Sequence, residues 1–407
     1  MGQNVGAAAI ITDSSFLSAA RAEALAAPES GIVEVYNYGR GRQGLIPLWV
    51  GEGDLPTPAF ISEAATRSLA AGETFYTYQR GIPELRAAIA AYMSRVYGPL
   101  HGAPFAPERF FVTTGGMLAL QIAIRIVAGN GDSVLVPTPA WPNFAGAILT
   151  AGAVPVDVPM TLTAGETPRW HLDLEVLEAA ITPNTKAMVI NTPSNPTGWT
   201  ATREELVALL DLARRHGLWI IADEIYGRLV YDGDRAPSFH DLIDEHDRVM
   251  FVQTMSKNWA MTGWRIGWLE APPVLGQVIE NLIQYSVSGL PVFIQRAAVA
   301  ALERGEGFIA HQIARMTENR DVLCDALAAT GRARFARPEG AFYLFCAIDG
   351  EPDTRKLALR LIDEALVGVA PGSAFGTGGE EYLRICLARK PDDTAEAARR
   401  LRVWLGG

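Results

Sequence analysis

The middle of the chain alternates short apolar runs with segments of helical periodicity, and this alternation limits the fold more than any other feature. Five apolar runs have the length of buried strands: residues 110–114, 133–137, 187–191, 218–223 and 249–254. The segment 201–217 reads as an amphipathic helix, with Thr202 as its N-cap and Gly217 as its stop. Strands that alternate with helices predict an α/β fold with a mainly parallel sheet flanked by helices. Ligands bind beyond the carboxyl ends of the strands in such sheets.

The chain is too long for one ordinary domain. It has 407 residues, whereas single cores stop growing near roughly 250–300 residues. In the C-terminal part, a long helical stretch at residues 294–330 precedes three short apolar runs. We therefore expect a large domain over residues 56–293 and a smaller α+β domain over residues 294–407. Residues 1–55 are rich in Gly and Pro, and we expect this arm to join the small domain or reach a partner subunit.

The composition argues against several kinds of partner. A net charge of −10 argues against a nucleic-acid surface and against anionic membranes. Cys324, Cys346 and Cys386 are too few for a disulfide framework or a zinc site, so no metal is expected. The N-terminal leader lacks the basic region of a secretory signal, and no apolar stretch reaches the roughly 18 residues of a membrane span. We therefore expect a cytoplasmic protein.

One glycine pattern is misleading. Gly39, Gly41 and Gly44 satisfy the G-x-G-x-x-G spacing of dinucleotide-binding loops. That function needs a helix directly after the glycines, whereas the continuation LIPLWVG contains Pro47 and reads as extended. No dinucleotide site is expected here.

The segment 251–268 carries the most informative cluster of side chains. Lys257 follows an apolar run and lies among methionines and tryptophans, so its ammonium can be buried. Burial lowers the pKa of a lysine and frees its amine for imine chemistry. Arg265 offers a planar fork suited to a phosphate, and Thr254 adds a hydroxyl. A surface lysine and a structural arginine remain the alternative from this segment alone.

A glycine turn follows the apolar run 110–114. Gly115 and Gly116 let the backbone approach an anion closely. The helix expected from Met117 onward would present unpaired N–H groups and the positive end of its dipole. This combination suits a phosphate group, although Gly-Gly turns are common.

Three other strand-end segments carry polar or aromatic side chains. Asp223 ends an apolar run, and an anionic Asp beside a pyridine nitrogen keeps that nitrogen protonated, so that the ring can accept electrons from a carbanion. Tyr226 and Asn195 can donate to a phenolic oxygen, and Trp141 can stack on an aromatic ring. An Asp that caps a turn, an ordinary turn at Asn195 and core burial of Trp141 are the alternatives.

Arg384 lies inside the apolar run YLRICLA. Because a buried guanidinium is costly without a partner, it requires a carboxylate from the protein or from a ligand.

Taken together, these segments resemble the class I/II (aspartate-type) aminotransferases, which are fold type I pyridoxal-phosphate enzymes. The resemblance covers nearly the whole chain, from GEGDLPTP at residues 51–58 to YLRICLA at residues 382–388, and SKNWAMTGWRIG at residues 256–267 is its most specific motif. It implies pyridoxal 5'-phosphate as cofactor and a homodimer. It also implies the transfer of an amino group between an L-amino acid and a 2-oxo acid by a ping-pong mechanism.

The resemblance assigns roles around the cofactor ring. Lys257 matches the Schiff-base lysine, and Asp223 matches the partner of the pyridine nitrogen. Asn195 and Tyr226 match the residues bonded to the phenolic oxygen, and Trp141 matches the aromatic side chain that stacks on the ring.

It also assigns the contacts to the phosphate and the substrate. The residues that match phosphate contacts are Gly115, Gly116, Thr254 and Arg265. Met117 stands where some members have a polar side chain, which puts one phosphate contact in doubt. Tyr76 matches a tyrosine that reaches the phosphate of the neighbouring subunit. Arg384 matches the arginine that binds the substrate α-carboxylate, and Gly51 matches a glycine whose backbone assists there.

Other activities on this fold and the choice of substrate remain open. A fold type I carbon–sulfur lyase, or a related decarboxylase or synthase, would share the cofactor residues. A transcription regulator on this fold would add a basic winged-helix domain, which we do not expect because the N-terminal leader is short and uncharged. Aspartate-specific members often use a second arginine, but the matching stretch 282–291 has no Arg or Lys. Arg40 and Arg42 can substitute for it, or the donor has an apolar or aromatic side chain.

Overall fold

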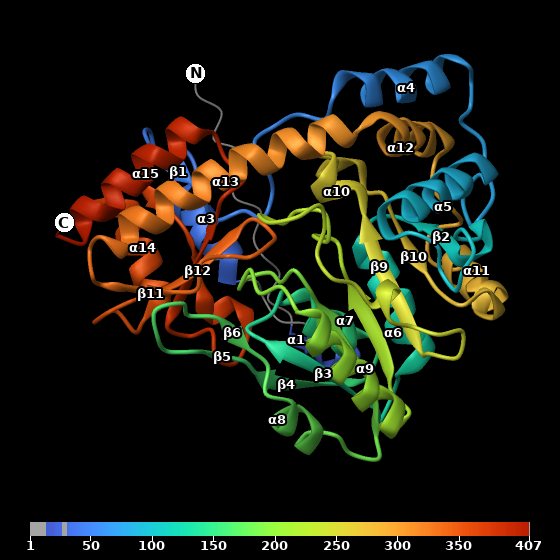
Figure 1. Cartoon of the computed structure of the whole chain (residues 1–407), viewed down its shortest axis with the longest axis horizontal. Coiled ribbons are helices and arrows are strands. Elements are labelled where there is room, and N and C mark those ends of the chain that lie inside the picture. The colour runs from blue at the N-terminus through green and yellow to red at the C-terminus, as the bar shows by residue number, and fades with distance from the viewer. Residues whose placement is uncertain (1–13, 27–30, 407) are drawn as a thin grey trace.

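The core of the molecule is a seven-stranded sheet (Figure 1). The computed structural model describes residues 14–26 and 31–406; the leader at residues 1–13 lies outside this description. The strands follow one another in the order β2 (Phe110–Thr113), β10 (Gly267–Glu270), β9 (Val249–Thr254), β8 (Trp219–Asp223), β7 (Thr185–Asn191), β3 (Ser133–Thr138) and β4 (Val154–Pro159). Within this sheet β10 runs antiparallel to both of its neighbours, β2 and β9, and the other pairs are parallel, so the predicted α/β fold with a mainly parallel sheet is confirmed.

Helices flank this sheet. α6 (Gly116–Val127) packs against β8, β9 and β10, and α9 (Arg203–His216) packs against β8. Other helices of this part of the chain are α4 (Ala59–Ala70), α5 (Pro83–Tyr97), α7 (Asn143–Thr150), α8 (Leu174–Ala179), α10 (Met255–Asn258), α11 (Gly276–Gln284) and α12 (Val292–Arg304).

The ends of α9 follow the sequence signals. The Thr202 hydroxyl accepts a hydrogen bond from the backbone N–H of Glu205, and the Glu205 carboxylate accepts one from the N–H of Thr202. This capping box satisfies N–H groups that the helix itself leaves unpaired. The helix stops at Gly217, whose φ of 64° is left-handed and favours a residue without a Cβ.

The C-terminal part of the chain forms a second, four-stranded sheet. Its strands, in the order β11 (Ala333–Phe335), β12 (Tyr343–Ile348), β15 (Tyr382–Cys386) and β14 (Ala370–Pro371), are antiparallel to their neighbours. Three helices accompany it: α13 (Glu306–Ala328), α14 (Thr354–Glu364) and α15 (Pro391–Trp404). β1 (Ile46–Pro47) pairs in parallel with β13 (Val367–Gly368), so the N-terminal segment lies beside this C-terminal part (Figure 1).

The helical stretch expected at residues 294–330 consists of two helices, α12 and α13, that meet at Gly305. A Cβ at residue 305 would lie 2.2 Å from Nε1 of Trp259 and 2.5 Å from the carbonyl oxygen of Ala301. Glycine therefore lets the chain turn closely against the Trp259 ring, which periodicity alone does not reveal.

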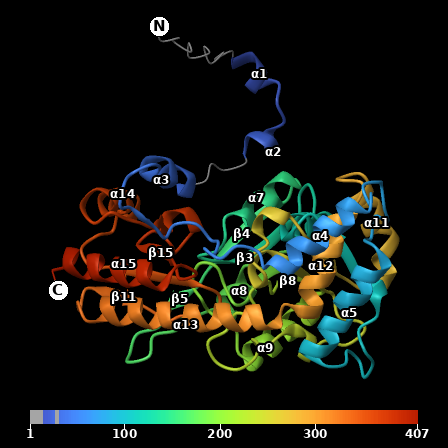
Figure 2. The same ribbon diagram turned by 90° about the horizontal axis from the view of Figure 1, so that it is seen from above.

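The N-terminal helices take different positions. α3 (Gly31–Gly39) packs against α14 and β14, whereas α1 (Ser14–Ser18) and α2 (Ala22–Leu25) lie away from the two sheets (Figure 2). Phe16 and Leu25 are 73% and 52% exposed. An arm that reaches a partner subunit stays a prediction. After α3 the chain enters the extended strand β1 rather than a helix, so the glycines at 39–44 do not open a dinucleotide-binding helix.

The part of the chain that the structure describes has neither a membrane-spanning helix nor a metal-binding cluster. None of its helices combines the length and the apolar character needed to cross a membrane. No cluster of three His, Cys, Asp or Glu side chains is arranged there to bind a metal ion.

Candidate active site

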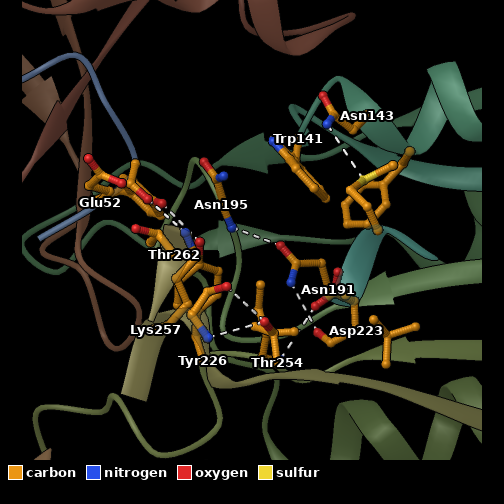
Figure 3. A pocket seen from close by; sticks show the side chains of 18 of the residues that line it. Glu52, Trp141, Asn143, Asn191, Asn195, Asp223, Tyr226, Thr254, Lys257 and Thr262 are labelled. Atoms are coloured by element: carbon orange, nitrogen blue, oxygen red, sulfur yellow. Dashed lines mark hydrogen bonds between the residues drawn. The ribbon is translucent and has the colours of Figure 1, made fainter. Parts of the chain in front are cut away.

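A cavity of about 400 Å³ lies at the carboxyl ends of β7, β8 and β9, where residues of the second sheet also reach it (Figure 3). Eleven of the thirteen predicted site residues line it: Gly51, Gly116, Met117, Trp141, Asn195, Asp223, Tyr226, Thr254, Lys257, Arg265 and Arg384. Gly115 lies directly before the lining residue Gly116, and Tyr76 lies elsewhere on the surface, 95% exposed. Segments far apart in the sequence therefore meet at one site.

Lys257 lies on the short helix α10, directly after β9. The Thr254 hydroxyl caps this helix by accepting a hydrogen bond from the N–H of Ser256. The Lys257 amine donates to the carbonyl oxygen of Gly51 at 2.7 Å. Burial lowers the pKa of this amine to about 8, so a much larger fraction is unprotonated near neutral pH than for an ordinary lysine. The amine is therefore suited to attack a carbonyl group.

The start of α6 and the Arg265 side chain form one end of the cavity. Gly115 has a φ of 80°, and a Cβ there would lie 2.7 Å from Nη2 of Arg265. Arg265 also donates to the carbonyl oxygen of Thr262 at 2.8 Å. Free N–H groups at the helix start and a guanidinium together suit a small anion such as a phosphate. The Met117 sulfur accepts a hydrogen bond from Asn143, so residue 117 adds no polar side-chain donor for an anion.

Asp223 ends β8 and is 2% exposed. Burial raises the pKa of its carboxyl to about 7, although the N–H of Ile225 and the Lys257 charge oppose this shift. A cationic ring nitrogen beside the carboxyl would favour the ionised form. The Asn191 amide donates to the Asp223 carbonyl oxygen at 3.0 Å and accepts from the N–H of Asn195 at 2.8 Å, which ties the two strand ends together.

Arg384 is buried in β15 without a carboxylate partner among the described residues. Nη1 donates to the side-chain oxygen of Asn195 at 3.1 Å, and Nη2 donates to the carbonyl oxygen of Trp49 at 2.5 Å. Nε is buried and bonds to no atom of residues 14–26 and 31–406. The Arg384 guanidinium carbon lies over the rings of Tyr343 and Phe375, 4.7 and 4.8 Å from the ring centres. A buried positive charge without a protein anion favours a ligand carboxylate as its partner.

Aromatic side chains complete the walls. Trp141 packs edge-on against Phe144, with 5.6 Å between ring centres, and presents its indole to the cavity (Figure 3). The Tyr226 ring lies 5.9 Å from the Lys257 amine, and its hydroxyl lies 2.8 Å from that of Tyr343.

Other residues that line the cavity were not predicted from the sequence, among them Ile32, Glu52, Asn191 and Tyr343. Asn191 ends an apolar run and Glu52 follows Gly51 directly, whereas the local sequence around Ile32 and Tyr343 gives no such signal. Arg40 and Arg42, suggested above for a distal carboxylate, do not line the cavity. Arg42 forms an ion pair with Asp363 instead.

The fold and this cavity define an α/β protein with a buried lysine amine beside groups that suit a small anionic ligand. The family follows from comparison with known proteins, since residues 44–401 match the family described as aminotransferase class I and II. The chain therefore belongs to the class I and II aminotransferases and is a transaminase, as the resemblance predicted.

Individual relatives agree with this family. The chain is 34% identical over 365 residues to a probable aspartate/prephenate aminotransferase of Aquifex aeolicus, which covers 88% of this chain and 90% of that protein. It is also 34% identical over 375 residues to aromatic-amino-acid aminotransferase 2 of Thermococcus litoralis, covering 91% and 94%. The crystal structure of an aspartate aminotransferase from Thermotoga maritima superimposes with a TM-score of 0.86 at 32% identity, covering 95% of this chain and 100% of that one. These relatives do not favour the carbon–sulfur lyase alternative.

Proposed function

We propose that the enzyme uses pyridoxal 5'-phosphate to move an amino group between an L-amino acid and a 2-oxo acid. The observation that carries this proposal is a buried guanidinium without a protein anion, Arg384, in the same cavity as Lys257, whose amine has a lowered pKa. When bound, the cofactor supplies a conjugated ring that accepts the electron pair released at the substrate α-carbon.

The residues present fit this cofactor. Gly115, Gly116, Thr254 and Arg265 are the proposed contacts to the phosphate. Asp223 would bind the protonated ring nitrogen, and Trp141 would cover the ring. Asn195 already accepts from Arg384 through its side-chain oxygen, which leaves its NH₂ group free to donate to the phenolic oxygen beside Tyr226.

The chain's own groups then direct the reaction. Arg384 would orient the donor by its α-carboxylate, with the Gly51 backbone beside it. The Lys257 amine would accept the α-proton of the bound donor and would later give that proton back. Hydrolysis by one water would release the donor as a 2-oxo acid, with its amino group retained in the site. A second 2-oxo acid takes that group in the reverse sequence.

We further propose that donors with apolar or aromatic side chains are preferred to aspartate. Ile32, Val50 and Phe144 line the cavity. Its cationic lining side chains are Lys257, Arg265 and Arg384 within the described part of the chain, and each of these has another proposed role. A distal carboxylate would therefore lack a partner from this subunit.

A panel of amino donors tests both proposals through the absorption spectrum of the bound cofactor. We expect L-amino acids to convert the cofactor to its aminated form, apolar and aromatic donors faster than aspartate. Asp223→Asn should slow this conversion at least ~10²-fold, because a neutral amide no longer stabilises the protonated ring nitrogen. Release of ammonia or sulfide in place of a 2-oxo acid would contradict the transaminase assignment. Equal rates for Asp223→Asn and the unaltered enzyme would refute the role of Asp223, and a preference for aspartate would refute the side-chain proposal.

We propose that the active enzyme is a homodimer in which Tyr76 reaches the phosphate of the neighbouring site. The exposed surface supports this, since Phe75, Tyr76 and Tyr285 are 83%, 95% and 88% exposed. Large aromatic side chains exposed to this extent are typical of protein interfaces. Sedimentation of the enzyme at assay concentration should give a dimer, and a monomer with full activity would exclude the shared site.

A further inference from the structure

Tyr343 links two parts of the active site, although its sequence context does not mark it as a site residue. It is fully buried on β12 and lines the cavity. Its hydroxyl lies 2.8 Å from the hydroxyl of Tyr226. Its ring lies 4.7 Å from the guanidinium carbon of Arg384. One side chain therefore contacts both the tyrosine proposed for the phenolic oxygen and the arginine proposed for the substrate carboxylate.

Gly51 leaves the space that the Tyr343 hydroxyl occupies. A Cβ at residue 51 would lie 2.5 Å from Oη of Tyr343. Real Cβ atoms do not approach a neighbour so closely, so alanine at residue 51 would displace the hydroxyl from its present position. The glycine thus preserves the contact between the two tyrosines.

Each of the two phenols carries one proton, so only one of them can be the donor in the hydrogen bond between them. Burial raises the pKa of Tyr226 and of Tyr343, so both hydroxyls keep their protons. A phenol has one proton to donate. If Tyr226 donates that proton to an oxygen in the cavity, its contact with Tyr343 requires Tyr343 to be the donor. Consecutive hydrogen bonds polarise one another. The hydrogen bond that Tyr343 donates to Tyr226 therefore strengthens the one that Tyr226 donates in turn.

We propose that Tyr343 is a positioning residue whose hydroxyl donates to Tyr226 and turns the single Tyr226 proton toward the phenolic oxygen of the bound cofactor. The inference rests on the proposed function, because the phenolic oxygen belongs to pyridoxal phosphate. The Tyr343 ring has a separate role as a surface for Arg384. Phenylalanine would retain that surface, so the effect of the hydroxyl can be measured alone.

Tyr343→Phe tests this proposal through the absorption of the bound cofactor, measured against pH without substrate. A donor to the phenolic oxygen stabilises the form that has lost its proton and carries negative charge on that oxygen. Loss of the Tyr343 hydroxyl should therefore raise the midpoint of the titration by about 0.5–1 pH unit, the effect expected of one hydrogen bond. Tyr226→Phe should raise it further. The double variant should match Tyr226→Phe alone, because Tyr343 acts through Tyr226.

Tyr231→Phe is the matched control, because the Tyr231 hydroxyl is buried and bonds to nothing in the described part of the chain. Its midpoint should equal that of the unaltered enzyme. Gly51→Ala moves the Tyr343 hydroxyl without removing it and should shift the midpoint upward as well. An unchanged midpoint in Tyr343→Phe, or a double variant in which the two shifts add, overturns the proposal. If pyridoxal phosphate gives no visible band with the unaltered chain, the proposed function fails instead.

Discussion

Alanine in place of Lys257 should abolish amino transfer while the chain stays folded. We expect kcat to fall at least about 10⁴-fold, because the variant loses both the attachment point of the cofactor and the base that moves the α-proton. Folding should not suffer, since burial disfavours the charged amine, as its lowered pKa shows. Single-turnover rates and the thermal unfolding midpoint separate these two effects. A variant that retains a tenth of the activity would remove Lys257 from the mechanism.

Chemical labelling checks the same residue independently. Borohydride reduction of the enzyme with bound cofactor, followed by peptide mapping, should place the pyridoxyl label on Lys257. The sequence has three other lysines, Lys186, Lys356 and Lys390, and none of them lines the cavity. Lys356→Ala is the matched control because that side chain is 77% exposed. This variant should be as active as the unaltered enzyme and should carry the label on Lys257. A label on any lysine other than Lys257 would refute the assignment.

The pH dependence of cofactor attachment follows from the lowered pKa. An amine attacks a carbonyl only when it is unprotonated. The rate at which the cofactor-free chain captures pyridoxal phosphate should therefore rise as the pH increases through about 8 and then level off. A rise centred near the ordinary lysine value of roughly 10.4 would contradict the burial argument.

Lysine in place of Arg384 should weaken every amino acid substrate while the cofactor spectrum stays unchanged. Lysine offers a point charge and lacks the planar fork that matches a carboxylate. It also cannot make both present bonds, to Asn195 and to the Trp49 carbonyl oxygen, in the same geometry. We expect a loss in kcat/KM of roughly 2–5 kcal/mol, as for a desolvated charge pair. Steady-state kinetics with several donors measures it.

Simple amines provide the control for this variant, because they have no carboxylate to lose. Their rates should change far less than those of amino acids. Arg337→Lys, at an exposed arginine that pairs with Asp321, should leave both substrate types unaffected. If Arg384→Lys slows amines and amino acids equally, or releases the cofactor, Arg384 is structural and the substrate class must be reconsidered.

The sequence located the residues that line the strand-end cavity because its signals are local. Asp223 and Thr254 each follow an apolar run directly, and the carboxyl ends of neighbouring parallel strands meet at one edge of the sheet. The contact between Tyr226 and Tyr343 was not predictable, since it joins residues 117 positions apart, one in the turn after β8 and the other on β12. Ile32 was missed because the position of α3 over the cavity depends on its packing against the C-terminal part. The break at Gly305 depends on the distant Trp259 ring, which periodicity does not encode.

The distance in sequence between Arg384 and Trp49 determines when the site can form during synthesis. The hydrogen bond between them joins positions 335 residues apart. The seven-stranded sheet is complete in sequence once β10 has left the ribosome, but the guanidinium comes from β15, much later in the chain. Because domains generally fold as units during synthesis, the N-terminal one first, a nascent chain without β15 would have the lysine but no group for the substrate carboxylate. Cofactor capture could then precede substrate recognition on the growing chain.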